Sequence, residues 1–228
     1  MIIARFIAAI LAGYLLGAIP FGLLIARRQA SIDVRQYGSG KIGTTNVLRT
    51  AGKKAAVLVA ALDILKGVMA VVVAGLIVGS GYLVVGDFGL GALLAQVFAA
   101  LAAMAGHNWS VFLKFKGGRG VATFMGGLVA LCPVAALFGG EILIIGTGLT
   151  RFVSIGSIAG TVGTYAILVP LTIMDGFPIE YLVYALIGTI IIVVMHRDNI
   201  KRLLSGSERK LGEKSKTANQ SLPVDGIE

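Results

Sequence analysis

Long apolar segments, separated by short polar connections, make up most of this chain. Most of them approach the roughly 20 residues that an α-helix needs to cross a hydrocarbon core. They comprise residues 2–26, 55–78, 88–106, 121–138, 142–150, 154–174 and 179–195. The pattern predicts an all-α, polytopic integral membrane protein with about seven transmembrane helices. The first segment is expected to remain as an anchor, because it is long and no convincing cleavage site follows it.

The basic residues predict how these helices are oriented. Seven Lys or Arg lie in residues 27–54, three in residues 107–120, one at Arg151 and seven after His196. Connections rich in Lys and Arg stay on the cytoplasmic side of a membrane. We therefore expect the N-terminus outside and the C-terminus in the cytoplasm. The alternate connections lack Lys and Arg and carry Asp87, Glu141, Asp175 and Glu180.

Residues 120–150 do not fit a regular span. As one helix these 31 residues would extend about 46 Å at ~1.5 Å per residue, which is too short for two full crossings. A single crossing would place Arg151 and the basic tail outside. We therefore predict a short or broken pair of helices that turns near Gly139, Gly140 and Glu141.

Composition supports this class and excludes others. Hydrophobic residues make up 57% of the 228 positions, charged residues 14%, and the mean hydropathy is +0.91, which excludes a soluble domain. The net charge of +9 lies in connections beside apolar segments, so it indicates membrane topology rather than nucleic-acid binding. The single cysteine, Cys132, excludes disulfides within the chain and cysteine metal clusters. We expect one transmembrane domain over residues 1–204 and a polar, mobile tail over residues 205–228.

The first of three polar segments, residues 37–50, combines glycines with short polar side chains. Its glycines leave backbone amides free to converge on an oxyanion, and Arg49 adds a bidentate charge. The segment is not a Walker A loop, because Arg35 and Ile42 stand where that loop needs Gly and Ser or Thr. The alternative is a loop whose Ser or Thr caps the second span. The candidate ligands besides Arg49 are Ser39, Gly40, Thr45 and Asn46.

The second polar segment, residues 106–127, leads directly into an apolar span. The positive end of that helix dipole would point at the same place as the basic side chains and would favour a phosphate. The alternative is a set of topology signals, but such signals do not require glycines. His107 is equally consistent with a side chain at the membrane interface and with a residue of the phosphate site. The candidate ligands are Lys114, Lys116, Gly117, Gly118, Arg119 and Gly120.

The third polar segment, residues 196–208, has an amphipathic helical pattern. His196 and Asn199 share one stripe, while Arg197, Lys201 and Arg202 can spread toward lipid headgroups. The alternative is a juxtamembrane helix bound to anionic lipid. Asp63 and Lys66, three residues apart in the second span, fit a structural pair better than reactants.

Together these segments resemble the membrane-integral bacterial acyl-phosphate:glycerol-3-phosphate acyltransferases. The family's first motif, S-G-N-x-G-x-T-N, is matched by Ser39, Gly40, Gly43, Thr45 and Asn46, with Lys41 in place of Asn. Its second, G-H-x-x-P-x-F-L-x-F-K-G-G-K-G-V-A-T, is matched by residues 106–123, with Ser110 for Pro and Arg119 for Lys. Its third, H-R-x-N-I-x-R-L-x-x-G-x-E, is matched by residues 196–208, and residues 17–22 are similar to the family's first span.

This resemblance implies transfer of a fatty acyl group from acyl phosphate to the sn-1 hydroxyl of glycerol 3-phosphate. The products would be lysophosphatidic acid and inorganic phosphate. Because acyl phosphate is already activated, the enzyme would mainly position the hydroxyl and neutralise charge. It also implies no cofactor, metal or nucleotide, and a place in the bacterial plasma membrane with the active site on the cytoplasmic side. A monomer is sufficient for this reaction, although no feature of the sequence decides the oligomeric state. Its partners would be acyl phosphate, glycerol 3-phosphate and membrane lipid.

The resemblance and the charges together suggest roles for individual residues. The expected catalytic and orienting residues are Ser39, Arg49, Lys114, His196 and Asn199. The expected phosphate-binding residues are Gly40, Thr45, Asn46, Lys116, Gly117, Gly118, Arg119 and Gly120. The proton of the hydroxyl would pass to His196 or to the phosphate of the substrate itself. Ser39 is either a hydrogen-bond donor, which we prefer, or a nucleophile that forms an acyl-enzyme.

Two other functions compete with this one. A transferase acting on a polyprenyl phosphate is disfavoured, because the chain lacks an Asp-rich metal motif. A transporter of phosphorylated solutes should place ionisable groups near the bilayer midplane in several spans. Here only Asp63 and Lys66 approach that position.

Overall fold

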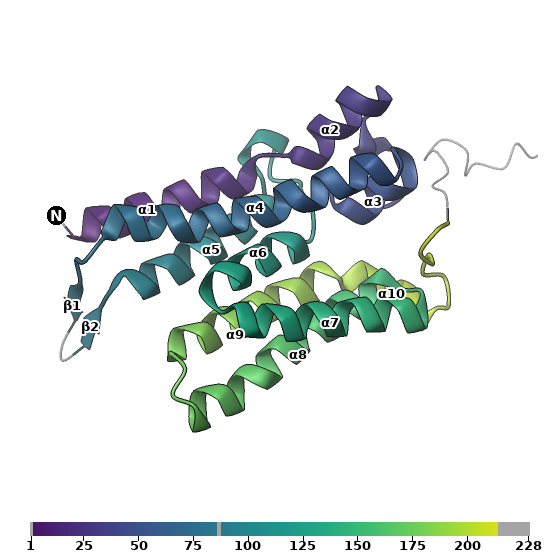
Figure 1. Ribbon diagram of the computed structural model, residues 1–228. Helices are drawn as coiled ribbons and strands as arrows, with labels where there is room; N and C mark the ends of the chain where they lie inside the picture. Colours follow the sequence, from purple (N-terminus) through teal and green to yellow (C-terminus); the bar gives the residue numbers. More distant parts are fainter. Residues whose placement is uncertain (1, 86–87, 214–228) are drawn as a thin grey trace, which may run out of the picture.

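The computed structural model describes residues 2–85 and 88–213, and most of them are helical (Figure 1). The all-α fold predicted from the apolar segments is therefore confirmed. A small antiparallel hairpin, β1 (Leu83–Val85) and β2 (Phe88–Leu90), is an addition that the sequence pattern did not predict. The α-helices are α1 (Ile2–Ala18), α2 (Phe21–Ala30), α3 (Thr44–Thr50), α4 (Lys53–Val78), α5 (Ala92–Asn108), α6 (Val121–Leu131), α7 (Pro133–Thr150), α8 (Val153–Met174), α9 (Ile179–Met195) and α10 (Arg197–Leu204), and the 3-10 turns are η1 (Val34–Gln36) and η2 (Val111–Leu113).

Four units are long and apolar enough to cross a membrane. The first is α1 together with α2, and the other three are the single helices α4, α7 and α8. The pair α9 and α10, bent by 57°, would be a fifth. The other two predicted spans correspond to the shorter helices α5, with 17 residues, and α6, with 11. The outer surface fits a lipid environment, because Leu76, Leu149 and Ile173 are 78%, 82% and 78% exposed.

The break in residues 120–150 exists, but its predicted position near Gly139, Gly140 and Glu141 is wrong. The chain breaks at Cys132, whose ψ of 84° ends α6, and Pro133 starts α7 at a position where its missing N–H costs nothing. Gly139 instead lies inside α7 and packs against α8, where a Cβ would come within 1.9 Å of Thr164 Oγ1. Glu141 therefore lies on a helix and is exposed, rather than in a connection. Asp87 lies outside the described residues.

The first predicted span is also broken, between Ala18 and Phe21, because Pro20 cannot continue the α1 hydrogen-bond ladder. The break exposes carbonyl groups at the end of α1. Ser110 Oγ donates to the Ala18 carbonyl at 2.6 Å, and Lys66 Nζ donates to the Ile19 carbonyl at 3.2 Å. Side chains from α4 and from the connection after α5 thus satisfy backbone groups that lipid could not.

Glycines allow several helices to approach closely, as is common in membrane bundles. α1 packs against α4 and α5, α4 against α6, and α7 against α8. The largest cluster of buried side chains lies mainly between α5, α6, α7 and α9, with single members from α4 and α8. At its centre the rings of Phe124 and Tyr184 stack with centroids 5.1 Å apart, and Tyr184 Oη donates to the Phe124 carbonyl at 2.9 Å.

The first and third polar segments lie at the end of the bundle opposite the β1–β2 hairpin (Figure 1), and Arg119 and Gly120 of the second segment line the same cavity as residues of the other two. We call this the motif end: α2, α3, residues 109–120, α10 and residues 205–213. Arg151 also lies there, because its carbonyl accepts the Leu211 N–H at 2.7 Å and its guanidinium donates to the Leu211 carbonyl at 3.3 Å. Part of the predicted tail is therefore packed against the bundle, while residues 214–228 lie outside the described residues.

We expect Gly13→Ala and Gly148→Ala to change stability in opposite directions. A Cβ at Gly13 would lie 2.3 Å from the Ala99 carbonyl oxygen of α5, so α1 would have to move. Overpacking of this kind costs about 1–3 kcal/mol. Gly148 has open space around it, and alanine there should stabilise α7 by up to ~1 kcal/mol. Thermal unfolding in detergent measures both shifts, and equal shifts would contradict the close packing of α1 on α5.

Candidate functional site

The three polar segments meet at one cavity of about 410 Å³ at the motif end. Helices α4, α6 and α7 form its apolar walls, so it joins a polar mouth to an apolar interior. Its polar lining residues include Ser39, Lys41, Thr44, Thr45, Asn46, Arg49, Arg119, Ser154, Ser157, His196, Asn199 and Glu208. Its apolar lining residues include Ala60, Ile64, Val121, Met125, Val129, Leu143 and Ile144.

Asn46 holds the first polar loop in shape. Its Nδ2 donates to the carbonyls of Val34, Tyr37 and Lys41 at 2.9, 3.0 and 2.9 Å. Its Oδ1 accepts the Ser39 N–H at 3.3 Å. The side chain is only 3% exposed and its hydrogen-bonding capacity is used by the loop. It shapes the wall of the cavity more than it offers a free group.

Ser39 and Thr45 line the cavity beside this loop, whereas Gly40 does not. Gly40 has a φ of +67° and donates its N–H to the Tyr37 carbonyl at 3.0 Å, so it closes the turn that presents Ser39. Within residues 2–85 and 88–213, Ser39 Oγ forms no hydrogen bond with a histidine or a carboxylate. A donor hydroxyl fits this setting better than an activated nucleophile.

Gly117 and Gly118 pack against α5 and do not line the cavity. A Cβ at Gly117 would lie 2.1 Å from the His107 carbonyl oxygen, and one at Gly118 would lie 2.0 Å from His107 Nε2. The Gly118 N–H donates to the His107 carbonyl at 3.0 Å, so this amide is already paired. Lys114 and Lys116 on the same connection are exposed and also lie outside the lining.

Gly120 and Arg119 bring the second segment into the cavity at the first turn of α6. Gly120 caps this helix with a φ of +80°, and the free amides that follow give a positive end to the dipole. Arg119 Nε is buried and has no partner among the described residues. Burial, and then the charge of Arg202, lowers the pKa of Arg119 to about 10, so the guanidinium remains charged at neutral pH.

Arg49 reaches the cavity from α3 and is held by the segment after α10. Its Nη2 donates to the carbonyls of Arg209 and Lys210 at 3.0 and 3.2 Å. In return the Arg209 guanidinium donates to the Gly38 carbonyl at 3.1 Å. Burial, and then the charge of Arg209, lowers the pKa of Arg49. The pKa of Lys41 is lowered too, by burial and then by the charge of Arg119.

Glu208 joins three elements at the motif end. Its Oε1 accepts from Asn199 Nδ2 at 2.6 Å and from Ser154 Oγ at 2.9 Å, and its Oε2 accepts from Arg202 Nε at 2.7 Å. Burial alone would raise the pKa of this carboxyl group, but the hydrogen bonds from Asn199, Arg202 and Ser154 outweigh it, so the pKa is lowered. Asn199 is thereby fixed, with Oδ1 buried and without a partner in the described part of the chain.

His196 sits between α9 and α10 and is 2% exposed. Its Nδ1 lies 2.8 Å from the Ile192 carbonyl oxygen, which is an acceptor only, so Nδ1 carries the proton. Burial, and then the charge of Arg119, lowers the pKa of His196 to about 4. The imidazole is therefore neutral at pH 7, and Nε2 has a lone pair for a proton or a hydroxyl.

The charges of the cavity favour an anionic ligand. Lys41, Arg49 and Arg119 line it. Its two carboxylates are already engaged: Asp63 Oδ1 lies 2.9 Å from Lys66 Nζ, and Glu208 lies 2.7 Å from Arg202. Phosphate groups suit such a site. No group of three or more His, Cys, Asp or Glu that could hold a metal ion occurs in the described residues.

Several lining residues were not candidates from sequence. In the sequence, Lys41 is a motif substitution, Glu208 is the last residue of a motif, Asp63 fits a structural pair with Lys66, and His107 is equally consistent with the membrane interface and with the phosphate site. The signal for Asp63 and His107 was available, since ionisable groups in an apolar span often mark a site. The predicted residues that do meet at the cavity are Ser39, Thr45, Asn46, Arg49, Arg119, Gly120, His196 and Asn199.

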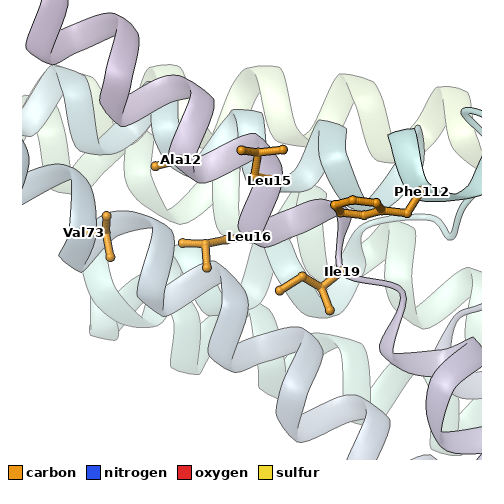
Figure 2. Close-up of a pocket in the computed structure, with 6 residues that line it drawn as sticks. All are labelled: Ala12, Leu15, Leu16, Ile19, Val73 and Phe112. Carbon is orange, nitrogen blue, oxygen red and sulfur yellow. The ribbon is translucent and has the colours of Figure 1, made fainter.

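A second hollow of about 440 Å³ lies between α1 and α4, and Figure 2 shows its lining side chains. All of them are apolar and Phe112 closes one end, so the hollow offers no group for acid–base chemistry or for binding a charge. Its other lining residues are Ala12, Leu15, Leu16, Ile19 and Val73.

Comparisons with known proteins agree on one family. The family model described as glycerol-3-phosphate acyltransferase matches residues 7–206. Glycerol-3-phosphate acyltransferase 3 of Dehalococcoides mccartyi (strain ATCC BAA-2266 / KCTC 15142 / 195) is 62% identical over 95% of this chain and 100% of its own length. The enzyme named glycerol-3-phosphate acyltransferase in Halalkalibacterium halodurans is 42% identical, over 91% of this chain and 96% of its own.

A solved structure also matches along most of the chain. It is the crystal structure of PlsY (YgiH), an integral membrane glycerol 3-phosphate acyltransferase, in its glycerol 3-phosphate form. The TM-score is 0.78 at 36% sequence identity, covering 91% of this chain and 96% of that chain. The lysophosphatidic acid form of the same protein gives a TM-score of 0.76 at 36% identity.

We expect Glu208→Gln to lower the free energy of unfolding at pH 7 by about 1–3 kcal/mol, the usual cost of a lost charged hydrogen-bond network. Because the folded-state pKa is lowered, the stabilisation by Glu208 is present above the unfolded pKa of ~4.3 and is lost as pH falls through the folded value. Thermal unfolding from pH 7 to pH 3 should therefore bring wild type and variant together. The exposed Glu213 provides the control Glu213→Gln, and an equal effect there would contradict the prediction.

Proposed function

Because the chain belongs to the glycerol-3-phosphate acyltransferase family, we propose that it transfers a fatty acyl group from acyl phosphate to the sn-1 hydroxyl of glycerol 3-phosphate. The products are lysophosphatidic acid and inorganic phosphate. The family resemblance inferred from the three motifs is confirmed by the match over residues 7–206. The observation that carries the proposal is the cavity that joins Lys41, Arg49 and Arg119 to an apolar interior, since none of these three cations forms a salt bridge within the described residues.

In the proposed reaction the sn-1 oxygen of glycerol 3-phosphate attacks the acyl carbon of acyl phosphate. The new ester bond forms as the bond between the acyl carbon and the phosphate oxygen breaks, and the hydroxyl proton passes to a base. Inorganic phosphate carries away the released electron pair. Since this leaving group is good, most of the catalytic effect can come from positioning and charge neutralisation.

The charges suggest how the substrates are held. Arg49, Arg119 and Lys41 supply positive charge to the two phosphate groups, and Gly120 begins the helix whose dipole adds to it. The acyl chain extends along the apolar walls of α4, α6 and α7. Exposed Lys114 and Lys116 act from the rim, where they attract anions rather than clamp them.

His196 is the proposed base, with Asn199 beside it to orient the glycerol. The Nδ1–H bond to the Ile192 carbonyl leaves Nε2 as an acceptor for the sn-1 hydroxyl. The phosphate of the substrate is the alternative base. Ser39 is a hydrogen-bond donor to the acyl phosphate in this scheme, and glycerol 3-phosphate attacks directly.

The proposed setting is the bacterial plasma membrane, with the motif end on the cytoplasmic side and the protein active as a monomer. The support is the concentration of basic residues at that end, which matches the positive-inside rule. The remaining elements then complete a multi-pass protein of about seven spans, with α5 and α6 as its short members.

We expect purified protein in lipid to form lysophosphatidic acid and phosphate from palmitoyl phosphate and glycerol 3-phosphate, without added metal or nucleotide. A parallel reaction with acyl-CoA tests the donor. Product only from acyl-CoA would keep the acceptor and refute the donor. Uptake of glycerol 3-phosphate into vesicles without product would favour the transporter.

We expect His196→Ala to lower kcat by about 10²–10⁴, the usual contribution of a general base. Neutral His196 is the active form, so the base is lost as pH falls through its pKa, which is about 4 in the free protein. The wild-type rate should have an acidic limb that disappears in the variant. If the phosphate of the substrate is the base, both proteins should instead lose rate near pH ~6, its second pKa.

A further inference from the structure

Asp63 and Lys66 on α4 and His107 on α5 form a buried cluster that the proposed reaction does not use. Lys66 Nζ lies 2.9 Å from Asp63 Oδ1 and 2.8 Å from His107 Nδ1, and the three side chains are 2–4% exposed. Asp63 and His107 both line the cavity. Ionisable groups held inside a membrane protein are costly to bury and often serve a function.

The contacts of Lys66 determine the tautomer of His107. An ammonium group has donors only, so His107 Nδ1 must accept its hydrogen bond. Asp63 keeps Lys66 charged, since removing the ammonium would leave a buried carboxylate without its partner. The Ile19 carbonyl, 3.2 Å from Nζ, takes a further donor. The one proton of a neutral His107 ring therefore lies on Nε2.

His107 Nε2 lies beside the loop that leads into α6. A Cβ on Gly118 would be 2.0 Å from this nitrogen, so only glycine leaves room for the ring. The Gly118 N–H is fixed on the His107 carbonyl at 3.0 Å. Across residues 2–85 and 88–213, no acceptor is paired with Nε2. A donor thus lies next to the turn that carries Arg119 and Gly120.

We propose that His107 is a further substrate-binding residue, whose Nε2–H donates to a phosphate oxygen in the cavity. Asp63 and Lys66 are positioning residues that fix this tautomer. The proposal rests on the proposed function, because it requires a phosphate in the cavity. It also gives the two histidines opposite states: His107 is protonated on Nε2 and donates, while His196 is protonated on Nδ1 and accepts.

The wild-type protein itself provides the first test, since the chain has only two histidines. Protein labelled with ¹⁵N-histidine should show two neutral imidazoles of opposite tautomer, assigned with His196→Gln. Glycerol 3-phosphate or palmitoyl phosphate should shift the His107 Nε2–H resonance. An imidazolium or Nδ1–H form of His107 would overturn the proposal, and so would an unchanged resonance with both substrates.

Enzyme kinetics of two variants with amide side chains provide a second test. His107→Gln keeps a donor near the position of Nε2, whereas His107→Asn reaches only the position of Nδ1. We expect the Asn variant to raise the KM of one phosphate substrate by about ten-fold or more, as for a lost hydrogen bond to a charged group. The Gln variant should retain most of the affinity. Equal KM values in the two variants would refute the Nε2 donor.

Tyr14→Phe is the matched control for packing. Tyr14 Oη donates to the Trp109 carbonyl at 2.8 Å, two residues after His107, but Tyr14 does not line the cavity. Its loss should lower the melting temperature and leave both KM values unchanged. Lys66→Met should change the tautomer of His107 in the same NMR spectrum, and retention of the Nε2–H tautomer would contradict the positioning role.

The two proposals can fail separately. An active enzyme with His107 protonated on Nδ1 would refute only the binding role of His107. A protein with the expected tautomers and a phosphate-dependent shift, but without acyl transfer, would refute only the proposed reaction.

Discussion

Two carbonyl oxygens become free where α1 stops before Pro20, and the motif end depends on how they are satisfied. In a bilayer such groups have no water to bind, so the protein must supply donors. Ser110 donates to the Ala18 carbonyl and Lys66 to the Ile19 carbonyl. Because Lys66 also contacts Asp63 and His107, the break in one helix is tied to buried polar groups on two others.

The same chain of contacts continues to the cavity. His107 holds Gly118 through its backbone carbonyl, and Gly118 leads to the residue that caps α6. The break in α1 near Pro20 is therefore linked, through α4, α5 and the loop before α6, to the N-terminal end of α6. This helix end is the one proposed to face phosphate. This explains why glycines occur together with basic residues in the second polar segment: some make room for packing, and Gly120 ends the loop with a positive φ.

Sequence could predict the apolar helices and the meeting of the three polar segments, because both follow from composition and motif order. It could not place the break in residues 120–150. Gly139 is a residue type common in turns, yet here it lies inside α7 and allows close packing on α8. The break lies instead at Cys132, and Pro133 starts the next helix. Sequence also gave Asn46 and Gly118 the role of ligands, whereas hydrogen bonds within the fold occupy both. Whether such a group bonds to the fold or to a ligand depends on distances in the tertiary structure, which a sequence motif does not give.

If His196 is the base, as proposed, its base strength should depend on the occupancy of the cavity. Burial and the charge of Arg119 lower its pKa to about 4 in the free protein, so alone it is a weak base. A phosphate bound at Arg119 would offset the positive charge that opposes protonation, and the pKa of His196 would then rise toward its usual value. The base would be strongest when the anionic substrates are in place.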